Sequence, residues 1–197
     1  MKIAALVLAA GTSSRMGSNK LLADMGGRPL IMRTVQNILA SQVNKVFVVT
    51  GHQSDEVKAA LQSEEVEFAY NSEFASGLAS SVREGVAVAK DFDGVLVCLG
   101  DMPLVSPQIL DKMIETYDFA QGRDLVVPTY EGKFGNPVLW GSRYFPELAA
   151  LRGDRGAREL IDRYRERVIG IEVGDEAVAL DADTPEALAH IKSIAGF

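Results

Sequence analysis

The feature that most constrains this chain is an apolar run near its beginning that stops at a glycine. Residues 3–10 are all apolar, and the polar segment that follows lies between Gly11 and Gly17. Arg15 and Lys20 place one cation on either side of the second glycine. In open α/β proteins, a buried strand of this kind leads into a glycine-rich loop whose backbone N–H groups and fixed positive charge hold phosphate groups. Since ligands in such folds bind beyond the carboxyl ends of the strands, the segment predicts a nucleotide or phosphate site.

The spacing of this loop matches neither of the common phosphate-binding motifs. A Walker A loop has four residues between its glycines and places Lys directly after the second one. Here five residues separate the glycines, and Ser18 and Asn19 come before Lys20. The dinucleotide-binding pattern G-x-G-x-x-G is not followed either. On spacing alone, a loop with solvated charges is an open alternative.

Length and composition are those of an ordinary globular domain. The 197 residues can bury a substantial core, with 47% hydrophobic and 24% charged residues. A net charge of −7 argues against a general nucleic-acid binder, whose surface is usually basic. The single cysteine, Cys98, excludes an internal disulfide and has apolar neighbours, which favours an inert core residue over a catalytic thiol. We find neither a bilayer-spanning apolar run nor a signal-peptide pattern, so we expect a cytoplasmic protein without membrane partners.

Strand-like and helix-like segments alternate along the chain. We expect strands at 3–9, 46–49, 66–70, 95–99, 125–127, 137–140, 168–173 and 178–180. We expect helices from Pro29 to about residue 39, from a cap at Ser54, at 77–89, from a cap at Ser106 to about residue 117, and at 143–151, 156–165 and 184–195. No linker or repeat interrupts this order. We therefore predict one domain over residues 1–197, a three-layer α/β/α Rossmann-like sandwich around a mostly parallel, mixed sheet.

Carboxylates follow two of the other expected strands. Asp101 comes just after strand 95–99, at the sheet edge where the glycine loop also lies, and a carboxylate there can hold a hard cation such as Mg²⁺. A turn residue that accepts backbone hydrogen bonds is the alternative. Asp181 and Asp183 follow strand 178–180, and Asp183 could instead cap the last helix. Two acidic strand ends beside a cationic loop would together form a metal–triphosphate site.

Two further polar segments have both a functional and a structural interpretation. Gly77, Ser80 and Ser81 stand at the start of an expected helix, where they can contact a base or ribose or simply cap the helix. Residues 151–158 contain three arginines and two glycines, which suits bidentate binding of an anionic substrate but also a solvated loop. The two histidines lack partners at metal-ligand spacing, and we assign them no role.

Taken together, these segments resemble the MobA-like nucleotidyltransferase family over nearly the whole chain. Residues 8–11, 15–17 and Lys20 are similar to the family's first loop, and residues 100–103 and 181–185 resemble its two metal-binding segments. Within the family, the chain is most similar to the molybdenum cofactor cytidylyltransferases. Ala10 stands where guanylyltransferases usually have glycine, residues 100–103 are similar to the cytidylyl-type Gly-Asp-x-Pro, and residues 135–140, 145–148 and 153–158 resemble that group's second half.

The resemblance implies a fold of the nucleotide-diphospho-sugar transferase type, with the nucleotide bound by the first half of the chain and the acceptor by the second. It implies catalytic roles for Arg15, Lys20 and Asp101, and a Mg²⁺ ion held by Asp101 and by Asp183, which is favoured over Asp181. The implied nucleotide-binding residues are Ala9, Ala10, Gly11, Arg15, Lys20, Gly77, Ser81 and Asp101. The implied acceptor-binding residues are Asn136, Arg152, Asp154 and Arg158.

The implied reaction is the Mg²⁺-dependent transfer of CMP from CTP to the phosphate of molybdenum-bound molybdopterin. It yields molybdopterin cytosine dinucleotide and pyrophosphate, and a molybdenum hydroxylase or its chaperone is the implied partner. Such a transfer requires positioning and charge neutralisation rather than a protein nucleophile, and the chain has no Ser-His-Asp or Cys-His pattern. The alternatives are a guanylyltransferase, a transferase with another phosphorylated acceptor, and a non-catalytic cofactor carrier, which would not need a metal–triphosphate site.

Overall fold

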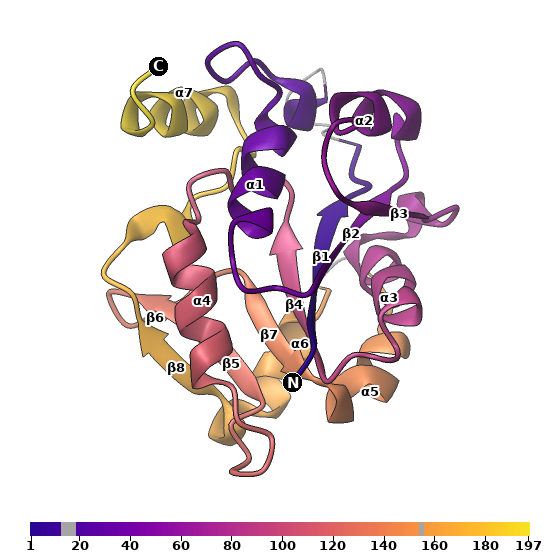
Figure 1. Cartoon of the computed structure of the whole chain (residues 1–197), viewed down its shortest axis with the longest axis vertical. Coiled ribbons are helices and arrows are strands. Elements are labelled where there is room, and N and C mark those ends of the chain that lie inside the picture. Colours follow the sequence, from indigo (N-terminus) through magenta and orange to yellow (C-terminus); the bar gives the residue numbers. More distant parts are fainter. Residues whose placement is uncertain (13–18, 154–155) are drawn as a thin grey trace.

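The computed structural model describes residues 1–12, 19–153 and 156–197, and its centre is a mixed sheet (Figure 1). The strands described are β1 (Ile3–Ala9), β2 (Lys45–Thr50), β3 (Glu67–Tyr70), β4 (Gly94–Leu99), β5 (Leu125–Tyr130), β6 (Lys133–Phe134), β7 (Val138–Gly141) and β8 (Ile169–Glu172). They lie in the order β3-β2-β1-β4-β7-β5-β6, with β8 beside β5. Neighbours pair in parallel from β3 to β4 and between β5 and β8, whereas the pairs that β7 and β6 form are antiparallel. The mostly parallel, mixed sheet is thus confirmed.

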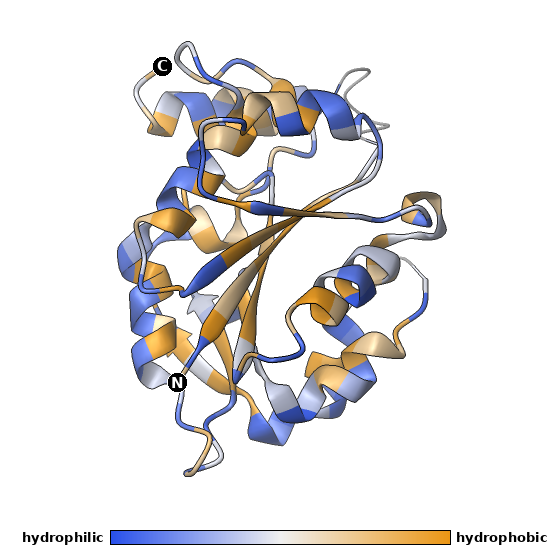
Figure 2. Ribbon diagram, turned by 45° about the vertical axis from the view of Figure 1, so that its right-hand side comes forward, coloured by the Kyte–Doolittle hydropathy of each residue, from blue (hydrophilic) through white to orange (hydrophobic). Residues whose placement is uncertain are grey.

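Helices cover both faces of this sheet. They are α1 (Leu30–Leu39), α2 (Ser54–Ala60), α3 (Leu78–Val88), α4 (Pro107–Thr116), α5 (Phe145–Ala149), α6 (Arg158–Arg163) and α7 (Pro185–Ile194). Because side chains alternate along a strand, Ala5 and Val7 of β1 pack toward α1, α2, α4 and α7, while Leu6 and Leu8 pack toward α3, α5 and α6. Burial on both faces explains why β1 is a continuous apolar run. Figure 2 shows hydrophobic strands between helices whose outer faces are largely hydrophilic, which confirms the three-layer architecture.

Some local predictions were wrong. The expected strand 178–180 is replaced by a 3₁₀ helix, η5 (Glu176–Ala179), because the Asp175 side chain accepts a hydrogen bond from the backbone N–H of Ala177 over 2.9 Å and holds a helical turn there. Ser54 does not cap α2: Gln53 takes the N-cap position, and the Ser54 hydroxyl donates to Oγ1 of Thr50 over 2.9 Å. Ser106 is the N-cap residue of α4, as expected, although its side chain makes no capping hydrogen bond.

The strand order reverses direction at β1. The chain passes from β1 to β2 and β3 on one side of the sheet, and β4 then pairs with the opposite edge of β1. The connections leaving β1 and β4 therefore diverge at their carboxyl ends, which is where open α/β sheets bind ligands. Within the part of the chain that the structure describes, every helix is too short or too polar to cross a lipid bilayer.

Candidate active site

A cavity of about 480 Å³ opens at the carboxyl ends of β1 and β4, a volume that suits a small-molecule ligand. The charged residues of the described wall are Lys20, Asp101, Asp181 and Asp183. The other described lining residues are uncharged and come mainly from the segment after β1, from the 3₁₀ helix η2 (Phe74–Ser76) and from the first turn of α3, and we call this part of the wall the neutral end. The described wall thus combines ionic side chains with a part suited to an uncharged ring.

Asp101 is held in place by a close approach of two strand ends. The N–H of Gly100 donates to the carbonyl oxygen of Leu8 over 3.0 Å, and Oγ1 of Thr34 donates to the Gly100 carbonyl, also over 3.0 Å. A Cβ atom at Gly100 would lie only 2.9 Å from that Leu8 oxygen, so β4 can end here against β1 only with glycine at this position. Asp101 follows directly and is buried, with its residue 7% exposed.

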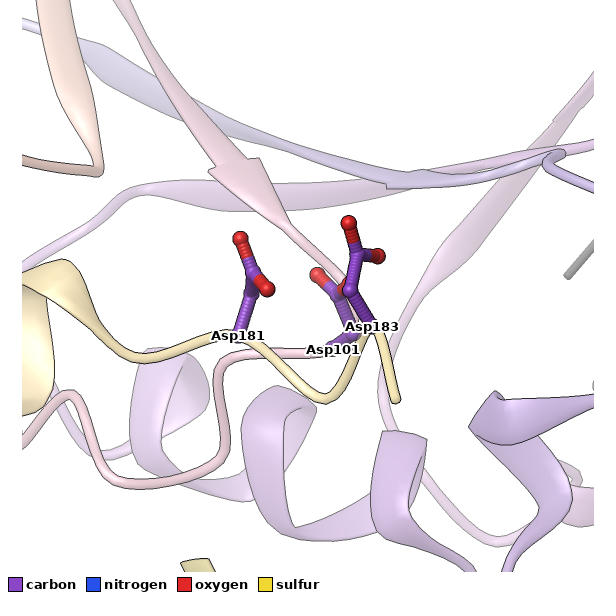
Figure 3. A group of neighbouring side chains, drawn as sticks. All are labelled: Asp101, Asp181 and Asp183. Atoms are coloured by element: carbon purple, nitrogen blue, oxygen red, sulfur yellow. The ribbon is translucent and has the colours of Figure 1, made fainter. Parts of the chain in front are cut away.

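Asp181 and Asp183 reach the same point from the segment before α7. The backbone N–H of the buried Ala182 donates to the carbonyl oxygen of Asp101 over 3.1 Å. Figure 3 shows the carboxylates of the three aspartates side by side and pointing the same way, and one ligand atom from each lies within 4.8 Å of the others. Thr184 is the N-cap of α7 and accepts from the N–H of Ala187 over 3.2 Å, so Asp183 is not needed as a cap.

Lys20 supplies the positive charge at this end of the cavity. It begins a 3₁₀ helix, η1 (Lys20–Leu22), which the Asn19 side chain caps by accepting from the N–H of Leu21 over 3.1 Å. Its ammonium group forms ion pairs with both Asp101 and Asp183. Burial lowers the pKa of Lys20, but the two carboxylates more than offset this effect, so its pKa lies above the ordinary value and the group is charged.

The acidic cluster fits a hard divalent cation. Three carboxylates meet at one point, and oxygen ligands of this kind are those that Mg²⁺ and Mn²⁺ prefer. Burial, followed by the negative charges of Asp101 and Asp183, raises the pKa of Asp181. The charges of Asp101 and Asp183 act on Asp181 in addition to burial, and a divalent cation placed among the three carboxylates would offset this repulsion. The structure brings together both candidates for the second metal ligand, Asp181 and Asp183.

At the neutral end, a buried amide orders the hydroxyl groups that follow Gly77. Gly77 is the N-cap of α3 and has a φ of +106°, a conformation that favours glycine. The fully buried Asn71 donates through Nδ2 to Oγ of Ser80 over 2.8 Å and to Oγ of Ser81 over 3.1 Å. Ser80 in turn donates to the Gly77 carbonyl over 2.8 Å. The serines therefore do not cap the helix, and Ser81, which lines the cavity, accepts from Asn71 and can donate its own hydrogen to a ligand.

Sequence reasoning missed several other residues of the cavity wall, among them Thr12, Phe74 and Leu78. Leu78 shares the helical spacing of the buried Val82 and Val86, but its exposed fraction is 39%. Because Leu78 is the first residue of α3, directly after Gly77, it extends over the cavity instead of the sheet. No sequence pattern reveals this position, because it depends on the backbone turn with positive φ at Gly77.

The remaining candidate residues differ in their position relative to the cavity. Ala10 and Gly11 line the cavity, whereas Ala9 is buried at the end of β1 and does not. Asn136 precedes β7, and its N–H donates to the Val178 carbonyl over 2.8 Å. Since Val138 pairs with Val97 of the antiparallel β4, Asn136 lies at the sheet edge of the cavity but is not part of its wall. Arg15 and Asp154 lie outside the described residues.

The loop with the other acceptor candidates rests against the neutral end of the cavity. The N–H of Ala79, in the first turn of α3, donates to the Gly153 carbonyl over 3.1 Å. Gly156 packs against Leu78 so closely that a Cβ atom there would come within 2.9 Å of Cδ2 of the leucine. Arg152 and Arg158 flank this contact and are exposed. They lie outside the cavity wall but beside its neutral rim.

Comparisons with known proteins agree with this geometry. A nucleotidyl transferase from Methanothermobacter is 26% identical, with a TM-score of 0.86 over 98% of this chain and 97% of that chain. Rv0371c from Mycobacterium tuberculosis H37Rv, in a complex with manganese, is 26% identical, with a TM-score of 0.81 over 98% and 99%. A CMP:2-keto-3-deoxy-manno-octonic acid synthetase complexed with CTP, at 16% identity and a TM-score of 0.74 over 99% and 98%, shares the fold.

A curated relative matches only part of the chain. The bifunctional protein GlmU from Francisella tularensis subsp. holarctica is 31% identical over 121 residues, which is 60% of this chain. The match spans about a quarter of that protein, 26% of its length. The model of the MobA-like NTP transferase domain matches residues 5–168, which include most of β1, all of β4 and the start of α3. This chain belongs to the family of MobA-like NTP transferase domains.

Proposed function

We propose that this protein transfers CMP from CTP to the phosphate of molybdenum-bound molybdopterin, in a reaction that needs Mg²⁺ and releases pyrophosphate. The observation that supports nucleotidyl transfer is that Asp101, Asp181 and Asp183 lie close together, with Lys20, in the wall of a cavity that can hold a nucleotide. A non-catalytic carrier would not require an acidic metal site beside a lysine. The choice of acceptor rests on the resemblance of residues 135–140, 145–148 and 153–158 to the molybdenum cofactor cytidylyltransferases.

The charged residues would hold the triphosphate and its metal. Asp101 would bind Mg²⁺ together with Asp183, Asp181 or both. When bound, Mg²⁺ supplies a Lewis acid that offsets charge on the reacting phosphates, and the manganese complex of the mycobacterial relative supports a divalent ion here. Lys20, together with Arg15 as the resemblance implies, would neutralise the leaving pyrophosphate. The backbone of Ala10 and Gly11 would approach the nucleotide.

The neutral end of the cavity would hold the base. Ser81 would donate its hydroxyl hydrogen to an acceptor on the base, while Gly77 leaves the backbone open to the ring edge. Cytosine carries acceptors at O2 and N3, which such a donor can meet. Ala10 in place of a second glycine supports CTP over GTP, and so does the CTP bound by the synthetase that shares this fold.

We further propose that the chain works as a single domain with two functional halves. The first half would bind the nucleotide. Asn136, Arg152, Asp154 and Arg158 of the second half would face the acceptor. This is supported by the contacts of Gly153 and Gly156 with the first turn of α3, beside the neutral end of the cavity. A molybdenum hydroxylase or its chaperone would then receive the product.

The test is incubation of the protein with each of the four NTPs, Mg²⁺ and molybdenum-loaded molybdopterin, with pyrophosphate and dinucleotide as readouts. We expect CTP to give the highest turnover and the product to be the cytosine dinucleotide. Equal or better use of GTP would overturn the choice of base. Turnover of CTP with other phosphate monoesters, but not with molybdopterin, would overturn the acceptor. Tight pterin binding without any pyrophosphate release would favour the carrier.

A further inference from the structure

Lys20 pairs with two of the three carboxylates that a metal ion would use. Its ammonium group is paired with Oδ2 of Asp101 and Oδ1 of Asp183, two of the three carboxylates of the acidic cluster. The Lys20 side chain is 17% exposed and that of Asp101 is 10% exposed, so this pair is shielded from water. A divalent cation and the ammonium group therefore require the same carboxylates.

We propose that Lys20 is a built-in counter-cation of the acidic cluster, which a divalent metal must displace and which the triphosphate of the nucleotide draws away. In this scheme, Lys20 excludes metal from the empty site and admits it together with the nucleotide. The inference rests on the proposed function only for the identity of the triphosphate. The competition between Lys20 and the metal follows from the residues themselves.

The physical basis is the cost of leaving a buried carboxylate, that of Asp101, unpaired. Asp101 without a cation would be a buried, uncompensated charge, which is strongly destabilising. In the metal-free protein, the ammonium group of Lys20 compensates this charge. It acts at a high effective concentration, because the chain holds it at the site. Metal that arrives alone must compete with these ion pairs for the same carboxylates. The free metal therefore binds weakly.

A triphosphate changes this balance. Lys20 lines the cavity in which the nucleotide would bind. A phosphate group of the nucleotide, placed beside Lys20, would offer the ammonium group a new anionic partner. The carboxylates then become available to the metal at a smaller cost. Since coupling between two ligands is reciprocal, nucleotide should strengthen metal binding by the same factor by which metal strengthens nucleotide binding.

The direct test measures Mn²⁺ binding in the absence of nucleotide, by the loss of the free Mn²⁺ signal in electron paramagnetic resonance. The variants are Lys20→Met, which keeps the length of the side chain without its charge, and the matched control Lys20→Arg, which keeps the charge. We expect Lys20→Met to bind Mn²⁺ at least about 10-fold more tightly than the wild type, within the usual range of such coupling. Lys20→Arg should stay within about threefold of the wild type. Unchanged or weaker binding by Lys20→Met would overturn the proposal.

A second measurement uses the wild-type chain and does not depend on how a variant folds. In protein labelled with ¹⁵N at the lysine side chains, the Nζ resonance of Lys20 should shift in proportion to the occupancy of the site as Mg²⁺ is added. Saturation of the site by Mg²⁺ with the Lys20 resonance unmoved would show that both cations share the cluster, and would refute displacement. Neither readout uses turnover. Failure of CMP transfer would therefore leave this result standing, and the two proposals can fail separately.

Discussion

The backbone N–H of Ala182 donates a hydrogen bond to the carbonyl oxygen of Asp101 over 3.1 Å. This bond joins the end of β4 to the segment before α7, which come from distant parts of the chain. Ala182 is fully buried, while its neighbours Asp181 and Asp183 line the cavity. The carboxylate geometry therefore depends on backbone contacts that do not involve the carboxylates, so a change of their charge need not disturb the fold.

We predict that Asp101→Ala abolishes CMP transfer without unfolding the protein. Loss of one group that stabilises charge in the transition state commonly reduces kcat by about 100- to 1000-fold, and we expect at least the lower figure. Circular dichroism should show an unchanged fold, because the bond from Ala182 uses the backbone of Asp101. Asp91→Ala, an exposed aspartate before β4, is the control and should keep wild-type turnover. Near-normal activity of Asp101→Ala with Mg²⁺ would show that the metal site was misassigned.

The raised pKa of Asp181 predicts a pH-dependent effect on stability. Burial and the charges of Asp101 and Asp183 raise this pKa above the ordinary value of an aspartate. Between the unfolded and folded pKa values the unfolded state binds fewer protons, so Asp181 lowers the stability of the metal-free protein as pH rises through this window. We therefore expect Asp181→Asn to raise the Tm of metal-free protein at pH 7, and the difference from wild type to shrink as the pH falls toward 4.

Metal should reverse the sign of this effect. With saturating Mn²⁺ the wild type gains the stabilisation that any ligand of the folded state provides, and Asp181→Asn should gain less of it. Glu65→Gln, which neutralises an exposed carboxylate outside the cavity, serves as the control and should change Tm little under either condition. A metal-free Tm of Asp181→Asn that is lower than that of wild type at pH 7 would contradict the interpretation.

The hydrogen bonds of Asn71 predict a role in base binding. Its amide can donate to Ser81, whereas the carboxylate introduced by Asn71→Asp can only accept, and would turn the Ser81 hydroxyl away from the base. Loss of one hydrogen bond costs roughly 0.5–1.5 kcal/mol, so we expect KM for CTP to rise about 2- to 10-fold while kcat changes little. Steady-state kinetics with CTP would measure this.

Two further variants separate this role from a structural one. Ser81→Ala should raise KM for CTP to a similar extent, and combining it with Asn71→Asp should add little, because both act through one hydrogen bond. Ser80→Ala is the matched control: it also loses a bond from Asn71, but Ser80 does not line the cavity. A rise in KM for Ser80→Ala as large as that for Ser81→Ala would mean that the network only supports α3.

The parts of this molecule that sequence predicted best are those set by local patterns. The apolar runs of β1 and β4 have few alternatives to burial in a parallel sheet, and the position of Asp101 follows from them. The 3₁₀ helix η5 was missed because one side-chain hydrogen bond, from Ala177 to Asp175, overrides the strand-like composition of the following residues. The exposure of Leu78 depends on the backbone turn at Gly77. The joint position of Asp181 and Asp183 depends on a long-range backbone bond that no local pattern contains.

The last prediction concerns the acceptor. We expect Arg158→Ala to raise the KM for molybdopterin about 10-fold while the KM for CTP stays within about twofold, because loss of a charged hydrogen bond costs about 1.5–3 kcal/mol and Arg158 lies outside the cavity wall. Arg163→Ala is the matched control on the same helix, since the Arg163 side chain is 62% exposed and pairs with Glu147. It should change neither constant. An equal rise in the KM values for molybdopterin and CTP in Arg158→Ala would refute the division of the chain into nucleotide and acceptor halves. It would mean that α6 supports the cavity as a whole.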